Sequence, residues 1–131
     1  MFEPRVALAS LSGEADADWA RAGSDHAGAA FLGGIALDEA TRDAARALVA
    51  RDRTEFLPED PLAFVERELD ALSDAPIRPG VNVRSATLGP VSTVAAVCAD
   101  RDAIVEINAH CRQGEMCDLG CGEALLRDTD R

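Results

Sequence analysis

The residue types best suited to chemistry gather near the end of the sequence, directly after an apolar run. Ala103–Asn108 contains three β-branched residues, which predicts a buried strand. The residues that end and follow this strand carry an amide, an imidazole and three thiols: Asn108, His110, Cys111, Cys117 and Cys121. In parallel α/β folds, catalytic and ligand-binding groups lie at the carboxyl ends of the strands. The sequence therefore predicts a functional loop here.

The clustered thiols fit two kinds of chemistry. A thiol on a loop held by a strand end can act as a general acid, and Cys111 is the thiol nearest the strand. Alternatively, Cys111, Cys117 and Cys121 can bind Zn²⁺ or an iron–sulfur cluster, with His110 nearby. Their spacing, with five and then three intervening residues, matches no standard zinc-finger or ferredoxin pattern. Both interpretations stay open, beside a third in which these thiols have no role.

The composition indicates an acidic protein without lysine. The 131 residues include 24 acidic and 13 basic side chains, all of the latter arginine, for a net charge of −11. Such a surface disfavours non-specific nucleic-acid binding. A high-salt cytoplasm and a GC-rich genome are both compatible with this composition. No stretch approaches the roughly 20 apolar residues of a membrane span, and no signal peptide is recognisable, so we expect a cytoplasmic protein without membrane contact.

Alternating apolar and amphipathic segments predict the elements that position this loop. Four expected strands are Val6–Ser10, His26–Leu37, Val81–Ser85 and Ala103–Asn108. Helical patterns follow them: Ala15–Ala22, Glu39–Arg53, a helix opened by Asp60 and Pro61, Gly89–Ala99, and a last helix opened by Gly120–Gly122. Strand–helix units in a row predict an α/β fold with parallel strands and right-handed crossovers. We see no internal linker, so residues 1–131 are expected to form a single domain.

Two local signals refine this outline. Asp38 is a favourable N-cap for the helix that begins at Glu39, and Asp60 caps a helix with Pro61 at its first position. Gly33 and Gly34 interrupt the second apolar run. Paired glycines at a strand end indicate either ordinary turn chemistry or a close approach of a ligand or another strand.

Periodicity alone does not choose between a flavodoxin-like sheet and half of a barrel, but one segment carries a family resemblance. Ile107–Arg112 (INAHCR) and Gly120–Asp128 (GCGEALLRD) resemble the fourth strand and following loop of the dihydrouridine synthases. These are FMN-dependent TIM-barrel reductases related to dihydroorotate and dihydropyrimidine dehydrogenases. The likeness is greatest to an archaeal branch with a cysteine-rich loop. The resemblance implies four consecutive β/α units forming the first half of a (β/α)₈ barrel.

The resemblance also implies roles for individual residues. Cys111 matches the acid that protonates a pyrimidine during reduction of its 5,6 double bond, and Asn108 matches an amide near the flavin. By position, Ala9, Ser10 and Asn82 would also contact FMN. Arg84, His110 and Arg112 would contact the substrate, and Arg84 could instead pair with a nearby acid. The family usually has Gly before this cysteine and Pro after it, where this chain has His110 and Arg112.

The half-barrel expectation has consequences for activity and partners. A complete barrel needs about 250 residues, and the family's flavin-binding lysine lies on a fifth strand. We therefore expect the chain to be part of an oxidoreductase, unable by itself to hold FMN tightly or to turn over. Its substrate would be a pyrimidine, with tRNA as one candidate. Its open sheet edges would be covered by a missing C-terminal half or by self-association.

Overall fold

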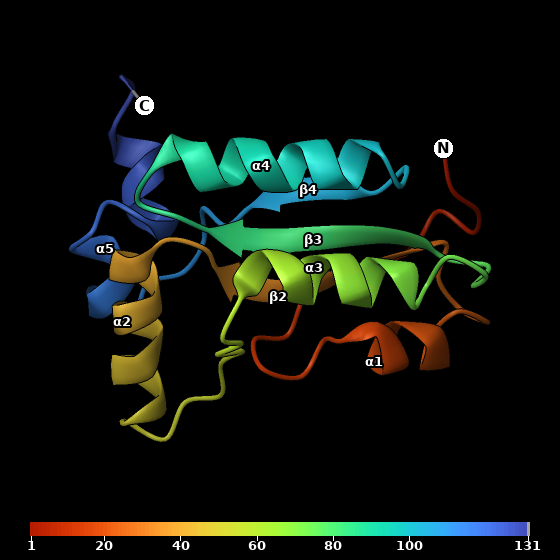
Figure 1. Ribbon diagram of the computed structural model, residues 1–131, viewed down its shortest axis with the longest axis horizontal. Coiled ribbons are helices and arrows are strands. Elements are labelled where there is room, and N and C mark those ends of the chain that lie inside the picture. Colours follow the sequence, from red (N-terminus) through yellow and green to blue (C-terminus); the bar gives the residue numbers. More distant parts are fainter. Residues whose placement is uncertain (131) are drawn as a thin grey trace.

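The computed structural model describes residues 1–130, which form one four-stranded parallel sheet with helices between the strands (Figure 1). The strand order follows the sequence: β1 (Ala7–Leu8), β2 (Ala29–Ala36), β3 (Arg78–Arg84) and β4 (Ile104–Ile107). All three neighbouring pairs are parallel. The predicted α/β class with four parallel strands is confirmed, and the sequential order is consistent with half of a β/α barrel.

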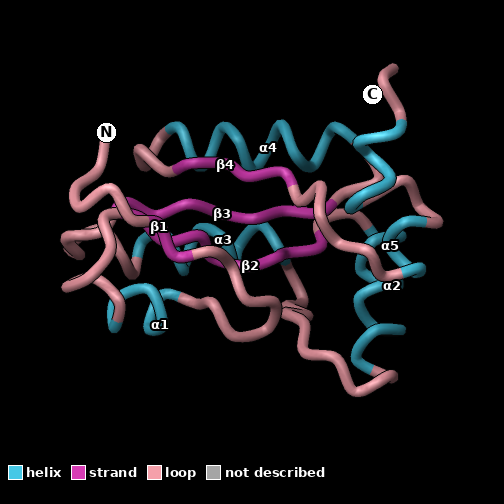
Figure 2. The backbone as a smooth tube through the Cα atoms, turned by 180° about the vertical axis from the view of Figure 1, so that it is seen from behind, coloured by secondary structure: helices cyan, strands magenta, loops and turns pink. Residues whose placement is uncertain are grey.

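Helices cover one face of the sheet. The elements between the strands are α1 (Ala17–Ala22), α2 (Glu39–Val49), α3 (Pro61–Asp70) and α4 (Leu88–Ala99). After β4 come the short α5 (Gly114–Cys117) and the 3₁₀ helix η1 (Gly122–Arg127). Helices α1, α3 and α4 lie against the same side of the sheet, as the front and back views together show (Figures 1 and 2). The main apolar core lies between these three helices and the strands.

Alternation along β3 separates an apolar face from a polar face. Val81 and Val83 are buried in the core beneath the helices. Successive side chains of a strand point to opposite faces, so Asn82 and Arg84 face the other side, where both are buried as well. The face opposite the helices is therefore polar near the carboxyl ends of the strands.

Helix α2 does not pack on the sheet face. It lies across the carboxyl ends of the strands, next to α5 (Figure 1). A second, separate apolar cluster forms there from the end of β2, the inner side of α2 and the segment after β4: Ala36, Ala44, Ala45, Leu48, Met116 and Cys121. The short helix α5, which the sequence did not predict, supplies Met116 to this cluster.

Several predicted boundaries were wrong. β1 contains two residues where five were expected, and α2 ends at Val49 rather than Arg53. β3 begins three residues earlier than predicted, because Arg78 donates a backbone hydrogen bond to Gly28 at 2.9 Å and continues the ladder with β2. The last predicted helix is the 3₁₀ helix η1.

Asp38 fixes both the start of α2 and the loop after β3. Its carboxylate accepts hydrogen bonds from Thr41 N at 3.0 Å and Ser85 Oγ at 2.6 Å, and from Ala86 N. Burial raises the pKa of Asp38, but the hydrogen bonds from Ser85, Thr41 and Ala86 outweigh it and leave the pKa below its ordinary value. The predicted cap is confirmed, and it also joins two loops at the carboxyl ends of the strands.

Replacing Asp38 by alanine is expected to lower the free energy of unfolding by about 2 kcal/mol at neutral pH, because a cap and two further hydrogen bonds are lost. The lowered pKa means that this stabilisation is complete above about pH 4 and is lost as the pH falls through the folded-state pKa. Urea unfolding of both proteins at several pH values measures the difference. A gap that stays constant down to pH 3 would contradict this assignment of the carboxylate.

Candidate functional site

A row of hydrogen bonds crosses the polar face of the sheet. Asn82 and Glu106 are register partners on β3 and β4, and the Asn82 amide donates to the Glu106 carboxylate. Asn108, immediately after β4, donates from Nδ2 to Asn82 Oδ1 at 3.1 Å. The Asn108 Oδ1 atom accepts from the backbone N–H groups of His110 and Cys111 at 3.3 and 3.1 Å. This row, from Glu106 to Cys111, joins the sheet to the predicted functional loop.

Gly34 makes room for the row. A Cβ atom at this position would lie 2.6 Å from Asn82 Oδ1, which is closer than such atoms approach one another. The preceding Gly33 has a φ of +110° and donates its backbone N–H to Ala15 at 3.0 Å. Of the two interpretations of the glycine pair, close approach is confirmed: a backbone segment lies against Gly33 and a buried side chain lies against Gly34.

Arg84 forms a buried ion pair. Its side chain is 2% exposed and that of its partner Glu55 is 6% exposed. The guanidinium donates to both carboxylate oxygens and, at 3.0 Å, to the carbonyl of Gly34. Its Nε atom is buried without a hydrogen-bond partner among the described residues. Pairing with an acid, one of the two predicted roles of Arg84, is therefore what the structure shows.

These groups border a cavity of about 430 Å³ at the carboxyl ends of the strands. Six of the predicted site residues line it: Ser10, Arg84, Asn108, His110, Cys111 and Arg112. Glu14, Arg53 and Glu55 add further charge to its wall. Two of the residues predicted to contact FMN lie outside the lining: Ala9 is exposed at the end of β1, and Asn82 is fully buried behind Asn108.

The three loop cysteines have different environments. Cys111 is half-buried in the cavity wall, and Cys121 is buried in the cluster beside α2. The Cys117 thiol points at the Cys111 carbonyl, with 3.5 Å between Sγ and O. Within residues 1–130, no three His, Cys, Asp or Glu side chains form a group that would hold a metal ion. The metal interpretation stays a prediction without a formed ligand set.

The loop that carries Cys111 is also held from α2. Arg51, just beyond the helix, donates to Glu115 at 2.7 Å and to Gln113 at 2.9 Å. The Arg51 pairing holds the pKa of Glu115 below its ordinary value. At its far end the loop returns to Cys111, whose carbonyl accepts from Glu123 N at 2.9 Å. The loop is thus tied to β4, to α2 and to its own end.

Sequence reasoning missed Glu55 and Glu106. Glu106 gave a usable signal, because it is a lone acid inside an apolar strand and must face the side opposite Val105. Glu55 gave no such signal, since it lies in an irregular segment 29 positions from Arg84. Its role follows only from the fold, which brings the segment after α2 beneath the end of β3.

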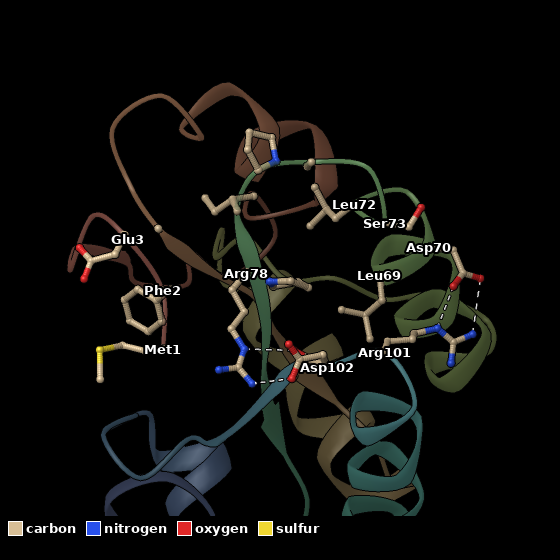
Figure 3. Close-up of a pocket in the computed structure, with 15 residues that line it drawn as sticks. Met1, Phe2, Glu3, Leu69, Asp70, Leu72, Ser73, Arg78, Arg101 and Asp102 are labelled. Atoms are coloured by element: carbon tan, nitrogen blue, oxygen red, sulfur yellow. Dashed lines mark hydrogen bonds and ion pairs between the residues drawn. The ribbon is translucent and has the colours of Figure 1, made fainter.

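A second cavity, of about 480 Å³, lies at the opposite, amino ends of the strands (Figure 3). Four of its charged side chains are already paired, Arg78 with Asp102 and Arg101 with Asp70, each at 2.8 Å. The Arg101 guanidinium lowers the pKa of Asp70. None of the predicted site residues lines this cavity, so the candidate site is the one at the carboxyl ends.

Comparison with known proteins finds a distant archaeal relative. No family model matches the chain, and no solved structure matches it. The chain is 30% identical over 131 residues to the uncharacterized protein MJ0144 of Methanocaldococcus jannaschii. The alignment covers 98% of this chain and 51% of that protein, so the chain spans about half the length of this curated relative. Among the described helices, none is long and apolar enough to cross a membrane.

Proposed function

We propose that the chain supplies part of the active site of a cytoplasmic FMN-dependent oxidoreductase that reduces the 5,6 double bond of a pyrimidine, free or within tRNA. The observation that carries this proposal is the hydrogen-bonded row that joins Asn82, Asn108 and the Cys111 loop at the carboxyl ends of parallel strands. These are the residues that the resemblance to dihydrouridine synthases assigns to the flavin and to the acid. Asn108 and Cys111 line the same cavity, and Asn82 holds Asn108 from behind it, which supports a shared role.

The cavity is large enough for a heterocyclic ligand. Its volume of about 430 Å³ lies within the range of ordinary ligand pockets. Bound FMN would supply the hydride for the reduction. No lysine of this chain binds the FMN phosphate, since the chain has none.

Within this function, Cys111 delivers the proton. A thiol is neutral at ordinary pH and can donate to carbon as a general acid. Asn108 fixes the backbone on which that thiol is carried, through its bonds to the N–H groups of His110 and Cys111. His110 and Arg112 flank the thiol and line the same cavity, and they would contact the substrate.

FMN binding tests this function directly. The protein expressed from its complete gene is expected to quench the fluorescence of added FMN, and the Cys111→Ala variant to quench it equally, because the thiol is assigned to proton transfer. Absence of quenching in the unmodified protein would remove the proposal. A loss of quenching in the variant alone would reassign Cys111 to cofactor binding.

A second candidate function is assembly without catalysis, in which a second copy of this chain covers the open edge of β4 and closes a barrel. One observation favours it: Ile107 on β4 is 47% exposed and lines a shallow pocket together with the exposed Leu88. The solution mass by light scattering is expected to be twice that of one chain, and Ile107→Lys to halve it. A monomer at high concentration would contradict this candidate.

A further inference from the structure

We infer that Glu106 is a positioning residue that sets the conformation of the Cys111 loop through two asparagine amides. Glu106 acts on Cys111 only indirectly: its carboxylate accepts a hydrogen bond from Asn82, which accepts one from Asn108, which accepts one from the loop backbone. The inference rests on the proposed function only for the chemical task of Cys111. The geometric claim concerns the loop alone.

The direction in which hydrogen bonds are donated along the row is fixed by the groups at its two ends. A backbone N–H can only donate and an ionised carboxylate can only accept. The N–H of Cys111 therefore requires the oxygen of Asn108 to face it, which turns the Asn108 NH₂ group toward Asn82. Asn82 must then accept from Asn108 and donate to Glu106, as the distances show. The Asn82 NH₂ group therefore needs a hydrogen-bond acceptor at position 106, which the Glu106 carboxylate provides.

Burial makes the order costly to break. Asn82 is fully buried and Asn108 is 5% exposed, so water does not readily replace a lost partner. Gly34 leaves little free space, since even a methyl group there would contact Asn82 Oδ1. Without an acceptor at position 106, the Asn82 amide has a buried, unpaired donor. Turning that amide would relieve the donor but would break the bond to Asn108, which frees the loop.

The test measures the reactivity of each cysteine in the full chain, without flavin. A brief pulse of iodoacetamide followed by peptide mass spectrometry reports labelling at Cys111, Cys117, Cys121 and Cys98 separately. Cys98 is buried in the main core and burial raises the pKa of its thiol, so it labels only if the fold opens. It serves as the internal control for global unfolding.

Glu106→Ala is expected to speed labelling of Cys111 about tenfold, since one lost hydrogen bond changes a population by a factor of about 5 to 30. Glu106→Gln removes the same charge but keeps an acceptor oxygen, and is expected to stay within about twofold of the unmodified protein. Glu66→Ala removes a carboxylate from α3, which covers the opposite face of the sheet from the row, and is expected to leave labelling of Cys111 unchanged. These controls distinguish the loss of the hydrogen-bond acceptor at position 106 from the loss of a negative charge.

Unchanged Cys111 labelling in Glu106→Ala, with Cys98 protected, would overturn the inference, and so would equal rates in the alanine and glutamine variants. If Glu106→Ala exposes Cys98, Asn108→Asp decides instead. That variant keeps an acceptor for the loop but removes the donor to Asn82, so faster labelling of Cys111 supports the row and an unchanged rate overturns it. Because the labelling is measured without flavin, these outcomes can be interpreted even if the protein does not bind FMN.

Discussion

The Arg84→Met variant is expected to lose about 3–5 kcal/mol of folding free energy, because it leaves the Glu55 carboxylate buried without its cation. Both side chains are almost fully enclosed. The same change removes the donor to the Gly34 carbonyl, which the structure records at 3.0 Å. Urea unfolding at neutral pH, followed by circular dichroism, measures the loss.

The double variant Arg84→Met with Glu55→Gln is the matched control. It removes both charges together, so the remaining cost is the loss of packing and neutral hydrogen bonds, and we expect it to recover at least half of the stability lost by the single variant. The two sites are in contact, so their effects should not add. A single variant within about 1 kcal/mol of the unmodified protein would show that water reaches Glu55 in solution.

The Cys111→Ala variant is expected to slow pyrimidine reduction by about 10²–10⁴, the usual contribution of a positioned general acid. This effect follows from the proposed function, in which the thiol protonates the carbon that does not receive hydride. The measurement is the loss of pyrimidine absorbance with chemically reduced FMN, under conditions where FMN binding has been verified.

Cys117→Ala provides the control for this experiment. Its thiol points at the Cys111 carbonyl rather than into the cavity, so its removal is expected to change the rate by only a few fold. Equal losses in the two variants would indicate that the loop conformation, and not the Cys111 thiol, limits the reaction. An unchanged rate in Cys111→Ala would assign the proton to another group.

The sequence predicted the fold class and most of the candidate site for the same physical reason. Alternation in β3 and β4 places polar residues at fixed positions near the strand ends, and parallel strands bring those ends to one edge. Asn108, Cys111, Arg84 and Ser10 could therefore be predicted to meet without knowledge of any contact. The family resemblance added the expected chemistry and did not change these positions.

What the sequence did not predict depends on long-range packing. The position of α2 across the strand ends follows from its contact with α5, a helix of four residues whose sequence carries no helical period. The partner of Arg84 lies in a segment without regular structure, so neither period nor spacing identifies Glu55. β1 is short because its pairing with β2 covers only Ala7 and Leu8, which composition does not reveal.

The two apolar cores of this protein are separate, so we expect one of them to open at lower free energy than the other. The cluster that holds α2 and the thiol loop is small, built largely from alanine, Leu48 and Met116, and separate from the core under α1, α3 and α4. Regions with few buried apolar contacts open at lower free energy than the rest of a domain. Amide hydrogens of α2 and α5 should therefore exchange before those of β2 and β3, so that the cavity admits bulky molecules while the sheet remains intact.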